Sequence, residues 1–384
     1  MTLEIVNLKK EFEQELPIET ERKLLPIFPE QLTELRTESY PIEQISLSHP
    51  SEPFSLRIRE TFKDGVLKYE AALKDRGILT PDGIRRIEVE VEVPDYLYPY
   101  YFDERTTPVL HKLRSAPEPS IAVDFYEDGA IQVEVEDFRS WPAFSDRFGE
   151  NFVDVTGDRI TDNEWRSHFN YRRQHQGQEA FAPKEELHSE DIVNDILARG
   201  IGNAPVIVHI GGRSGSGKST IVREVQAALE QLGLSQEVVS TDDYHRGTSW
   251  LRNHNGGQDW THWDAPVVYD IDTMASELEA LKGGEQIYTR EMDWAIAEPR
   301  IAGAITLPDV LLIEGIYANS PRITSPDDLV YEMTTPLATC IGRRLLRDMH
   351  ERPEFADPAK SLLYMLTEAE PAYRAQLAER GQSL

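Results

Sequence analysis

The 384-residue sequence has little of three things: cysteine, positive charge and long hydrophobic runs. Its one cysteine, Cys340, excludes a disulfide within the chain and predicts a reducing, cytoplasmic environment. No apolar stretch approaches the roughly 18 residues that a membrane-spanning helix requires. Charged residues follow closely on Met1, which predicts no secretory signal. The sequence therefore predicts no membrane partner.

Positive charge is scarce. The sequence has 40 Lys and Arg residues against 68 Asp and Glu residues, which gives a formal net charge of −28. A protein that binds nucleic acid without regard to sequence needs a basic surface, so no nucleic-acid partner is expected. Single hydrophobic cores stop growing at roughly 250–300 residues, so a chain of this length is expected to form two or three domains.

The spacing of apolar residues changes along the chain. Up to residue 172, short segments such as 86–93 and 131–136 carry apolar side chains at every second position, the period of a β-strand. Residues 173–190 are rich in Gln and charge, which predicts a linker. In residues 191–384, continuous apolar runs alternate with helical spacing, as in a mostly parallel sheet covered by helices. We expect a β domain at 1–172 and an α/β domain at 191–384.

A glycine-rich loop lies near the start of the second domain and fits the phosphate-loop pattern G-x-x-x-x-G-K-[ST]. An apolar run precedes it and helical spacing follows it, a context that disfavours a Gly/Ser-rich turn of another kind. Glycines let backbone N–H groups approach phosphate oxygens, and the N-terminus of a helix favours anions. Lys218 is expected to reach the outer phosphates of ATP, and Ser219 to bind Mg²⁺. The expected ATP-binding residues are Gly212, Arg213, Ser214, Gly215, Ser216, Gly217, Lys218, Ser219 and Thr220.

Four later segments favour transfer of a phosphoryl group to a hydroxyl. Asp242 follows a short strand and is placed to act as a general base, and Asp264 lies among aromatic residues. Glu314 ends a buried strand, as expected of a residue that holds Mg²⁺. Arg344 and Arg347 share one helix face and would clamp the transferring phosphate. Each segment alone also fits a helix cap or a solvated helix face, but their order after the phosphate loop favours a kinase.

These motifs resemble the uridine kinase group of P-loop kinases, relatives of phosphoribulokinase. The matching segments are residues 211–220, 241–245, 263–266, 313–316 and 343–352. The resemblance implies that Asp242 is the catalytic base and that Asp264 contacts a sugar hydroxyl of a nucleoside-like acceptor. It also implies Ser219 and Glu314 as Mg²⁺ ligands, and a lid over the phosphates that carries Arg344, Arg347 and Arg352. Of these, Arg352 is expected to bind ATP.

The sequence departs from that family's pattern where the acceptor is expected to bind. His245 stands at the position of a tyrosine, and Asp293 at that of a histidine that reads the base, whereas Tyr288 fits a tyrosine that contacts the base. A site that reads a base by hydrogen bonds discriminates strongly, so the change at Asp293 leaves the acceptor open. We expect Asp264, Tyr288 and Asp293 to contact the acceptor, without predicting which nucleoside it is.

The strands of the first domain alternate charged and apolar side chains. Arg57 and Arg59 share one face of their strand, while Leu56 and Ile58 share the other. An open sheet with a solvated outer face would give the same pattern. The recurrence of Lys/Arg pairs and Glu pairs in strand after strand argues against an open sheet. If the sheet closes, facing cations and carboxylates would bind a polyanion together with its divalent metal.

The opening Glu19-Thr-Glu-Arg-Lys resembles the E-x-E-x-K motif of CYTH domains, the triphosphate tunnel metalloenzymes, and further matches follow in family order to residue 172. The resemblance implies an antiparallel β-tunnel whose charged side faces inward and whose apolar side is covered by helices. It implies that Mg²⁺ or Mn²⁺ is bound by Glu19, Glu21, Glu134 and Glu136. It also implies that a triphosphate is bound by Lys23, Arg57, Arg59, Lys74, Lys112 and Arg114.

Together these features predict a Mg²⁺-dependent, two-domain phosphate enzyme. A tunnel would bind or hydrolyse a triphosphate or polyphosphate, and a P-loop kinase would transfer the γ-phosphoryl group of ATP to a nucleoside-like alcohol. Two alternatives remain open. In one, the P-loop domain hydrolyses or regulates, as in the plant tunnel proteins that join the same two domains in the opposite order and act as phosphatases. In the other, the tunnel is a non-catalytic sensor of polyphosphate or nucleotide.

Overall fold

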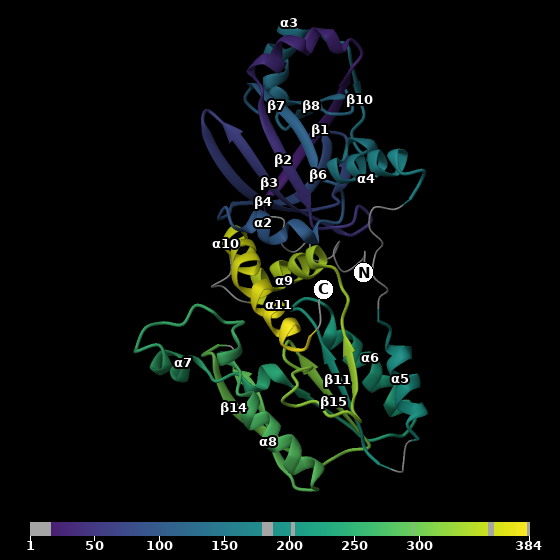
Figure 1. Cartoon of the computed structure of the whole chain (residues 1–384), viewed down its shortest axis with the longest axis vertical. Coiled ribbons are helices and arrows are strands. Elements are labelled where there is room, and N and C mark those ends of the chain that lie inside the picture. Colours follow the sequence, from purple (N-terminus) through teal and green to yellow (C-terminus); the bar gives the residue numbers. More distant parts are fainter. Residues whose placement is uncertain (1–16, 179–186, 201–203, 294, 352–356, 382–384) are drawn as a thin grey trace. The chain divides into compact units, whose positions relative to one another are not determined.

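The computed structural model describes residues 17–178, 187–200, 204–293, 295–351 and 357–381 (Figure 1). Contacts divide the chain into two compact units. The first consists of Met1–Pro183 and Pro336–Leu363, and the second of Lys184–Thr335 and Tyr364–Leu384. Within the described ranges, none of the helices has the length and hydropathy needed to cross a membrane.

Eight antiparallel strands of the first unit close into a barrel. Their order is β1-β9-β8-β7-β2-β3-β4-β6, and β6 pairs back onto β1 from Ile18↔Ile87 to Glu21↔Ile84. Two short strands extend the barrel, β5 beside β6 and β10 beside β1. The predicted antiparallel tunnel is thereby confirmed as a closed barrel. The strands are β1 (Ile18–Pro26), β2 (Tyr40–Ser46), β3 (Phe54–Lys63), β4 (Val66–Asp75), β5 (Ile78–Thr80), β6 (Gly83–Glu92), β7 (Leu110–Glu118), β8 (Ile121–Tyr126), β9 (Ile131–Val135) and β10 (Phe152–Asp154).

The alternation along the strands sorts the side chains into an apolar outside and a charged inside. On β3, Leu56 and Ile58 are fully buried in apolar packing, whereas Arg57 and Arg59 line the interior. Part of the apolar outside packs beneath helices η1 (Pro29–Glu38) and α3 (Trp141–Phe148), which contribute Leu32, Leu35, Phe144 and Phe148. The remaining helical segments of residues 17–178 are α2 (Leu97–Tyr101), η2 (Phe102–Glu104), η3 (Phe138–Ser140), η4 (Arg159–Thr161) and α4 (Asn163–Gln174).

Helix α9 (Leu337–Glu351) belongs to the first unit, although it follows the strands of the second unit in the chain. It packs against β3 and β4. The contact is close at Gly342, where an added Cβ would come within 2.6 Å of the ring of Phe54. A glycine at this position therefore lets the helix approach the barrel wall. From chain order, residues 336–363 are expected in the α/β domain, whereas the contacts group them with the barrel.

The second unit is built on a parallel sheet of order β12-β15-β11-β16. β11 and β15 are apolar and buried along almost their whole length, because one core covers each face of the sheet. Helices α5 and α6 pack on one face, and α7 and α8 on the other. The predicted P-loop domain with a parallel sheet is thereby confirmed. The strands are β11 (Val206–Gly211), β12 (Gln236–Ser240), β15 (Val310–Gly315) and β16 (Leu329–Glu332).

Helices and one separate hairpin complete this unit. The hairpin consists of β13 (Ile287–Asp293) and β14 (Glu298–Ile305), which pair only with each other among the described residues. A π-helical turn, η8 (Met365–Ala369), leads into α11 (Glu370–Glu379) from α10 (Pro358–Tyr364), which belongs to the first unit up to Leu363. The other helical segments are α5 (Ser189–Ala198), α6 (Lys218–Gln231), η5 (Thr241–Tyr244), α7 (Thr248–His254), η6 (Pro266–Val268) and α8 (Ile271–Lys282).

Candidate functional site

The glycine-rich loop connects β11 to the first turn of α6, as the sequence predicts. Gly212 and Gly217 have φ angles of 150° and 96°, in the region that glycine adopts without strain. A Cβ at Gly212 would also lie within 2.7 Å of the Cβ of Met333. Gly217 is the N-cap of α6, so the end of the loop coincides with a helix N-terminus, whose N–H groups favour anions.

Lys218 folds back across this loop. Its side chain is buried, and its Nζ donates to the carbonyl oxygens of Gly212 and Arg213, both at 2.9 Å. The ammonium group is therefore held against the loop that is expected to receive the phosphates. Backbone carbonyls fix its position without cancelling its charge.

Ser219 lies beside the carboxylate that ends the central strand β15. Its Oγ is 3.4 and 3.3 Å from the two carboxylate oxygens of Glu314. Burial raises the pKa of Glu314, the charge of Asp242 raises it further, and Lys218 opposes both. The structure thus brings together four predicted residues from three separate segments of the second unit.

A pair of carboxylates, Asp242 and Asp243, follows β12, the neighbour of β15 in the sheet. The Oδ1 atom of Asp242 is buried and has no hydrogen-bond partner among the described residues. Burial, Asp242 and Glu314 raise the pKa of Asp243 to about 7. Carboxylates thus gather at the carboxyl edge of a parallel sheet, where ligands of such folds bind.

The oxygen atoms around Ser219 suit Mg²⁺. The described residues contain no ready-made group of three or more His, Cys, Asp or Glu side chains for a metal. Mg²⁺ is usually held by one or two carboxylates together with substrate phosphates, so Ser219 and Glu314 fit such an ion.

Asp264 is held by aromatic hydroxyl groups. The hydroxyl of Tyr364 donates a hydrogen bond to Oδ2 of Asp264 at 2.8 Å and accepts one from the backbone N–H of Asp264 at 3.2 Å. The hydroxyl of Tyr317 donates to the backbone carbonyl of Asp264 at 2.8 Å. The ring of His245, which replaces an expected tyrosine, stacks on Trp263 with 6.0 Å between the ring centroids. The carboxylate of Asp264 is therefore fixed by its surroundings.

Two other residues expected to contact the acceptor lie on the hairpin strand β13. Tyr288 is 62% exposed, and Asp293 closes the hairpin by accepting the backbone N–H of Ala295 at 3.1 Å. Their roles stay predictions.

The arginines expected in the lid belong to α9, in the first unit. Arg344 and Arg347 both bind Asp348, at 3.3 and 2.9 Å, and this carboxylate is buried. By its internal contacts, the segment that carries these arginines belongs to the same compact unit as the barrel. Arg352 lies outside the described residues. Their function as lid residues stays a prediction.

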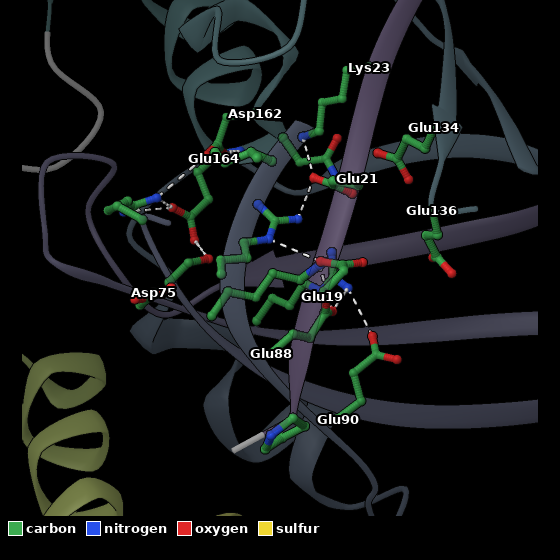
Figure 2. Close-up of a pocket in the computed structure, with 18 of the residues that line it drawn as sticks. Glu19, Glu21, Lys23, Asp75, Glu88, Glu90, Glu134, Glu136, Asp162 and Glu164 are labelled. Atoms are coloured by element: carbon green, nitrogen blue, oxygen red, sulfur yellow. Dashed lines mark hydrogen bonds and ion pairs between the residues drawn. The ribbon is translucent and has the colours of Figure 1, made fainter. Parts of the chain in front are cut away.

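The barrel encloses a charged cavity of about 410 Å³ (Figure 2). Seven basic and nine acidic side chains line it, so the acidic groups exceed the basic groups by two. A polyanion would therefore enter more favourably together with divalent cations. The basic residues are Lys23, Arg57, Arg59, Lys74, Arg76, Arg86 and Arg114, and the acidic ones are Glu19, Glu21, Asp75, Glu88, Glu90, Glu134, Glu136, Asp162 and Glu164.

Ion pairs hold the cations of the cavity in place. Lys74 Nζ lies 2.5 Å from Glu88 and 3.3 Å from Glu19. Arg114 bridges Asp124 and Glu134, each at 2.6 Å. Because these cations are fixed before a ligand arrives, little ordering cost remains when they bind phosphate.

The four carboxylates expected to bind metal come from adjacent strands (Figure 2). Glu19 and Glu21 lie on β1, and Glu134 and Glu136 lie on or just after β9. Burial raises the pKa of Glu136, and the charges of Glu19, Glu134 and Glu21 raise it further. A bound cation would relieve such crowding, but these four carboxylates do not form a ready-made metal-binding group among the described residues, so their role as ligands of Mg²⁺ or Mn²⁺ stays a prediction.

Lys112 is the one residue predicted to bind triphosphate that does not line the cavity. It is buried against Asp124, with 2.6 Å between Nζ and the carboxylate, and burial lowers its pKa to about 8. Asp124 in turn binds Arg114, which lies two residues further along the same face of β7, so Lys112 is linked to the cavity lining through this carboxylate. A direct contact of Lys112 with phosphate stays a prediction.

Arg86 lines the cavity but was not among the predicted residues. It donates to Glu19 at 3.0 Å and to Glu21 at 2.5 Å, and so joins both acids of the first motif. Alternation could have predicted its inward position, because Arg86 lies two residues before Glu88 and therefore shares the face of β6 that carries Glu88 and Glu90.

Asp124 permits a stability prediction, because it is fully buried between Lys112 and Arg114. Replacing it with asparagine should lower the free energy of unfolding of the barrel by about 3–5 kcal/mol, since the buried Lys112 loses its carboxylate partner and the partly buried Arg114 keeps only Glu134. Calorimetry of the full chain measures this as a lower melting temperature of the barrel transition. Asp137→Asn, which breaks an exposed pair with Arg139, should have a much smaller effect.

The same substitution should change the pH dependence of stability. Burial would raise the pKa of Asp124, but the charges of Arg114 and Lys112 outweigh it and lower the pKa. A lowered folded-state pKa gives stability above the ordinary carboxyl range that is lost as the pH falls through the folded value. The Asp124→Asn protein should therefore lose less stability on acidification than the wild type. An equal loss in both proteins would contradict this account of the pair.

Comparisons with known proteins agree with the geometry of the second unit. The Phosphoribulokinase / Uridine kinase family matches residues 207–369. The uridine kinase of Ureaplasma urealyticum is 32% identical over 152 residues, which cover 39% of this chain and 72% of that protein. The uridine kinase of Shewanella baltica is 34% identical over the same number of residues, covering 38% of this chain and 70% of that protein.

Among solved structures, the inorganic triphosphatase NE1496 is 22% identical, with 39% of this chain and 93% of that chain covered and a TM-score of 0.25. The family assignment rests on residues 207–369, which contain the phosphate loop, Asp242, Asp264 and Glu314. The chain belongs to the phosphoribulokinase and uridine kinase family, through its P-loop kinase domain.

Proposed function

We propose that the second unit transfers the γ-phosphoryl group of ATP to a hydroxyl of a nucleoside-like acceptor. The observation that carries this proposal is the buried Oδ1 of Asp242, which has no hydrogen-bond partner among the described residues. It lies close enough to Glu314 for their charges to interact, and Glu314 is itself beside Ser219 and Lys218. An acceptor hydroxyl would supply the missing partner and donate its proton there.

Each residue of the site has a separate role in the proposed reaction. Asp242 accepts the hydroxyl proton as the acceptor oxygen forms its bond to the γ-phosphorus, and the bond from that phosphorus to the β–γ bridging oxygen breaks to release ADP. Lys218 and the loop N–H groups stabilise negative charge on the phosphate oxygens. Ser219 and Glu314 would hold Mg²⁺, which when bound neutralises charge on the β- and γ-phosphates.

The acceptor is proposed from the relatives and from the surroundings of Asp264. The similar proteins of Ureaplasma and Shewanella are uridine kinases. A carboxylate fixed by Tyr364 and Tyr317 suits a contact to a sugar hydroxyl, and Tyr288 and Asp293 are the proposed contacts to the base. Arg344, Arg347 and Arg352 remain the proposed lid residues.

Release of ADP tests this function. The full-length protein is incubated with Mg²⁺-ATP and a panel of nucleosides, and ADP is measured with a coupled assay. We expect ADP release to depend on a nucleoside. ADP release that no nucleoside increases would favour the alternative in which the P-loop domain hydrolyses or regulates.

We propose a second function for the barrel, which is to bind a triphosphate or polyphosphate with Mg²⁺ or Mn²⁺ and hydrolyse it. The supporting observation is the charged cavity, in which fixed cations and crowded carboxylates face one another. Lys23, Arg57, Arg59, Lys74 and Arg114 would contact the phosphates, and Glu19, Glu21, Glu134 and Glu136 the metal. Lys112 would support Arg114 through Asp124.

Removal of the metal gives a direct prediction. Because acidic groups outnumber basic groups in the cavity, tripolyphosphate should bind only when Mg²⁺ or Mn²⁺ is present. Isothermal titration of the Lys218→Ala protein, whose phosphate loop is impaired, should show binding with Mg²⁺ and none after addition of EDTA. Equal affinity under both conditions would contradict a metal-dependent site.

A further inference from the structure

The first variable residue of the phosphate loop is held by a distant helix. Arg213 donates through Nε to one carboxylate oxygen of Glu370 at 2.8 Å and through Nη2 to the other at 3.0 Å. Its guanidinium group also lies 4.8 Å from the ring centroid of Tyr373. A two-point pair of this kind fixes direction as well as distance. The loop is thus tied to α11, 157 residues further along the chain.

Glu370 is a rigid anchor, because the helix around it is fixed on several sides. Arg374 donates to Glu370 at 2.9 Å within α11. Tyr373 donates to Glu332 at the end of β16, and Arg380 donates to the same carboxylate at 2.8 Å. A π-helical turn ends immediately before Glu370, and such turns are frequent at functional sites. Glu370 itself is buried.

The clamp acts on the group that holds the catalytic lysine. The carbonyl oxygen of Arg213 accepts a hydrogen bond from Nζ of Lys218, with 2.9 Å between the two atoms. Fixing the Arg213 side chain therefore also restrains the peptide that positions Lys218. We propose that Glu370 is a positioning residue, which holds the phosphate loop in its ATP-binding conformation through Arg213. This proposal rests on the proposed binding of ATP at this loop.

A different role for the pair predicts the opposite result. If Glu370 only neutralised Arg213, its removal would leave an extra positive charge near the phosphates and strengthen ATP binding. If it positions the loop, its removal weakens binding although the site becomes more positive. The sign of the change therefore separates the two roles.

A double-mutant cycle in the full-length protein measures this sign. The probe is the fluorescent methylanthraniloyl derivative of ATP, titrated with Mg²⁺ into wild type, Glu370→Gln, Arg213→Met and the double variant. We expect each single variant to bind about tenfold more weakly, and the double variant to be no weaker than the single ones, because both remove one clamp. Tighter binding by Glu370→Gln would overturn the proposal. Glu368→Gln, which instead breaks a pair with His262, is the matched control and should bind as wild type.

Hydrogen exchange without nucleotide separates this proposal from the proposed function. Glu370→Gln should accelerate exchange in residues 212–217 while the strands of the sheet keep their protection. If no protein binds the probe but this local acceleration occurs, ATP binding fails and the clamp stands. Unchanged exchange in the loop, or acceleration throughout the unit, would overturn the clamp, because the first shows no restraint and the second shows general destabilisation.

Discussion

Replacing Asp242 with asparagine should lower kcat for phosphoryl transfer by about 10²–10⁴-fold, the usual contribution of general acid–base catalysis. Asparagine keeps the shape of the side chain but does not accept the hydroxyl proton. ATP affinity should change little, because the proposed contacts to phosphate come from Lys218 and the loop. Steady-state kinetics with the nucleoside found to be active, combined with titration of the fluorescent ATP derivative, measures both quantities.

The neighbouring carboxylate provides a matched control. Asp243 is also partly buried beside Asp242 and Glu314, which with burial raise its pKa to about 7. Asp243→Asn removes a titratable carboxyl group next to the proposed base but leaves the base itself, so kcat should fall far less than in Asp242→Asn. If Asp243→Asn were the more damaging change, Asp243 would be the better candidate for the base.

The second large effect is expected in the barrel. Glu19→Gln combined with Glu21→Gln should reduce phosphate release from tripolyphosphate to the level of the uncatalysed control. Two carboxylates proposed to bind metal are lost, and Arg86, which contacts both, loses its anionic partners. A colorimetric phosphate assay with Mg²⁺ and with Mn²⁺ measures the rate. Glu92→Gln, on an exposed part of β6, is the control and should retain activity.

The same double variant tests whether the barrel is a sensor. On the hydrolytic proposal, its nucleoside-dependent ADP release should equal that of wild type. If wild type releases no phosphate from tripolyphosphate while the double variant has altered kinase kinetics, the barrel regulates the kinase and does not hydrolyse.

Much of the barrel could be predicted from local pattern. The alternation that places Leu56 on one face of a strand and Arg57 on the other is a direct consequence of strand geometry. Closure of the sheet could not be predicted from that pattern alone, because an open sheet has the same alternation. The CYTH resemblance supplied that expectation, and the pairing of β1 with β6 confirms the closure.

Contacts between distant parts of the chain were not predictable. The spacing of Arg344 and Arg347 predicts a helix face but not its partner, and α9 packs on the barrel through Gly342 and Phe54. The pairing of both Lys112 and Arg114 with Asp124, a neighbour across strands, was likewise not predictable from the spacing of the two cations. The pair of Arg213 and Glu370 joins residues that no short motif connects.

Phosphorus NMR of the wild-type protein with Mg²⁺-ATP and a nucleoside panel tests the central claim most directly. The account predicts that the γ-phosphate signal of ATP declines, and that equal amounts of ADP and a nucleoside monophosphate appear, with neither formed by Lys218→Ala. Conversion of ATP to ADP and inorganic phosphate, with no phosphorylated nucleoside from any member of the panel, would contradict it.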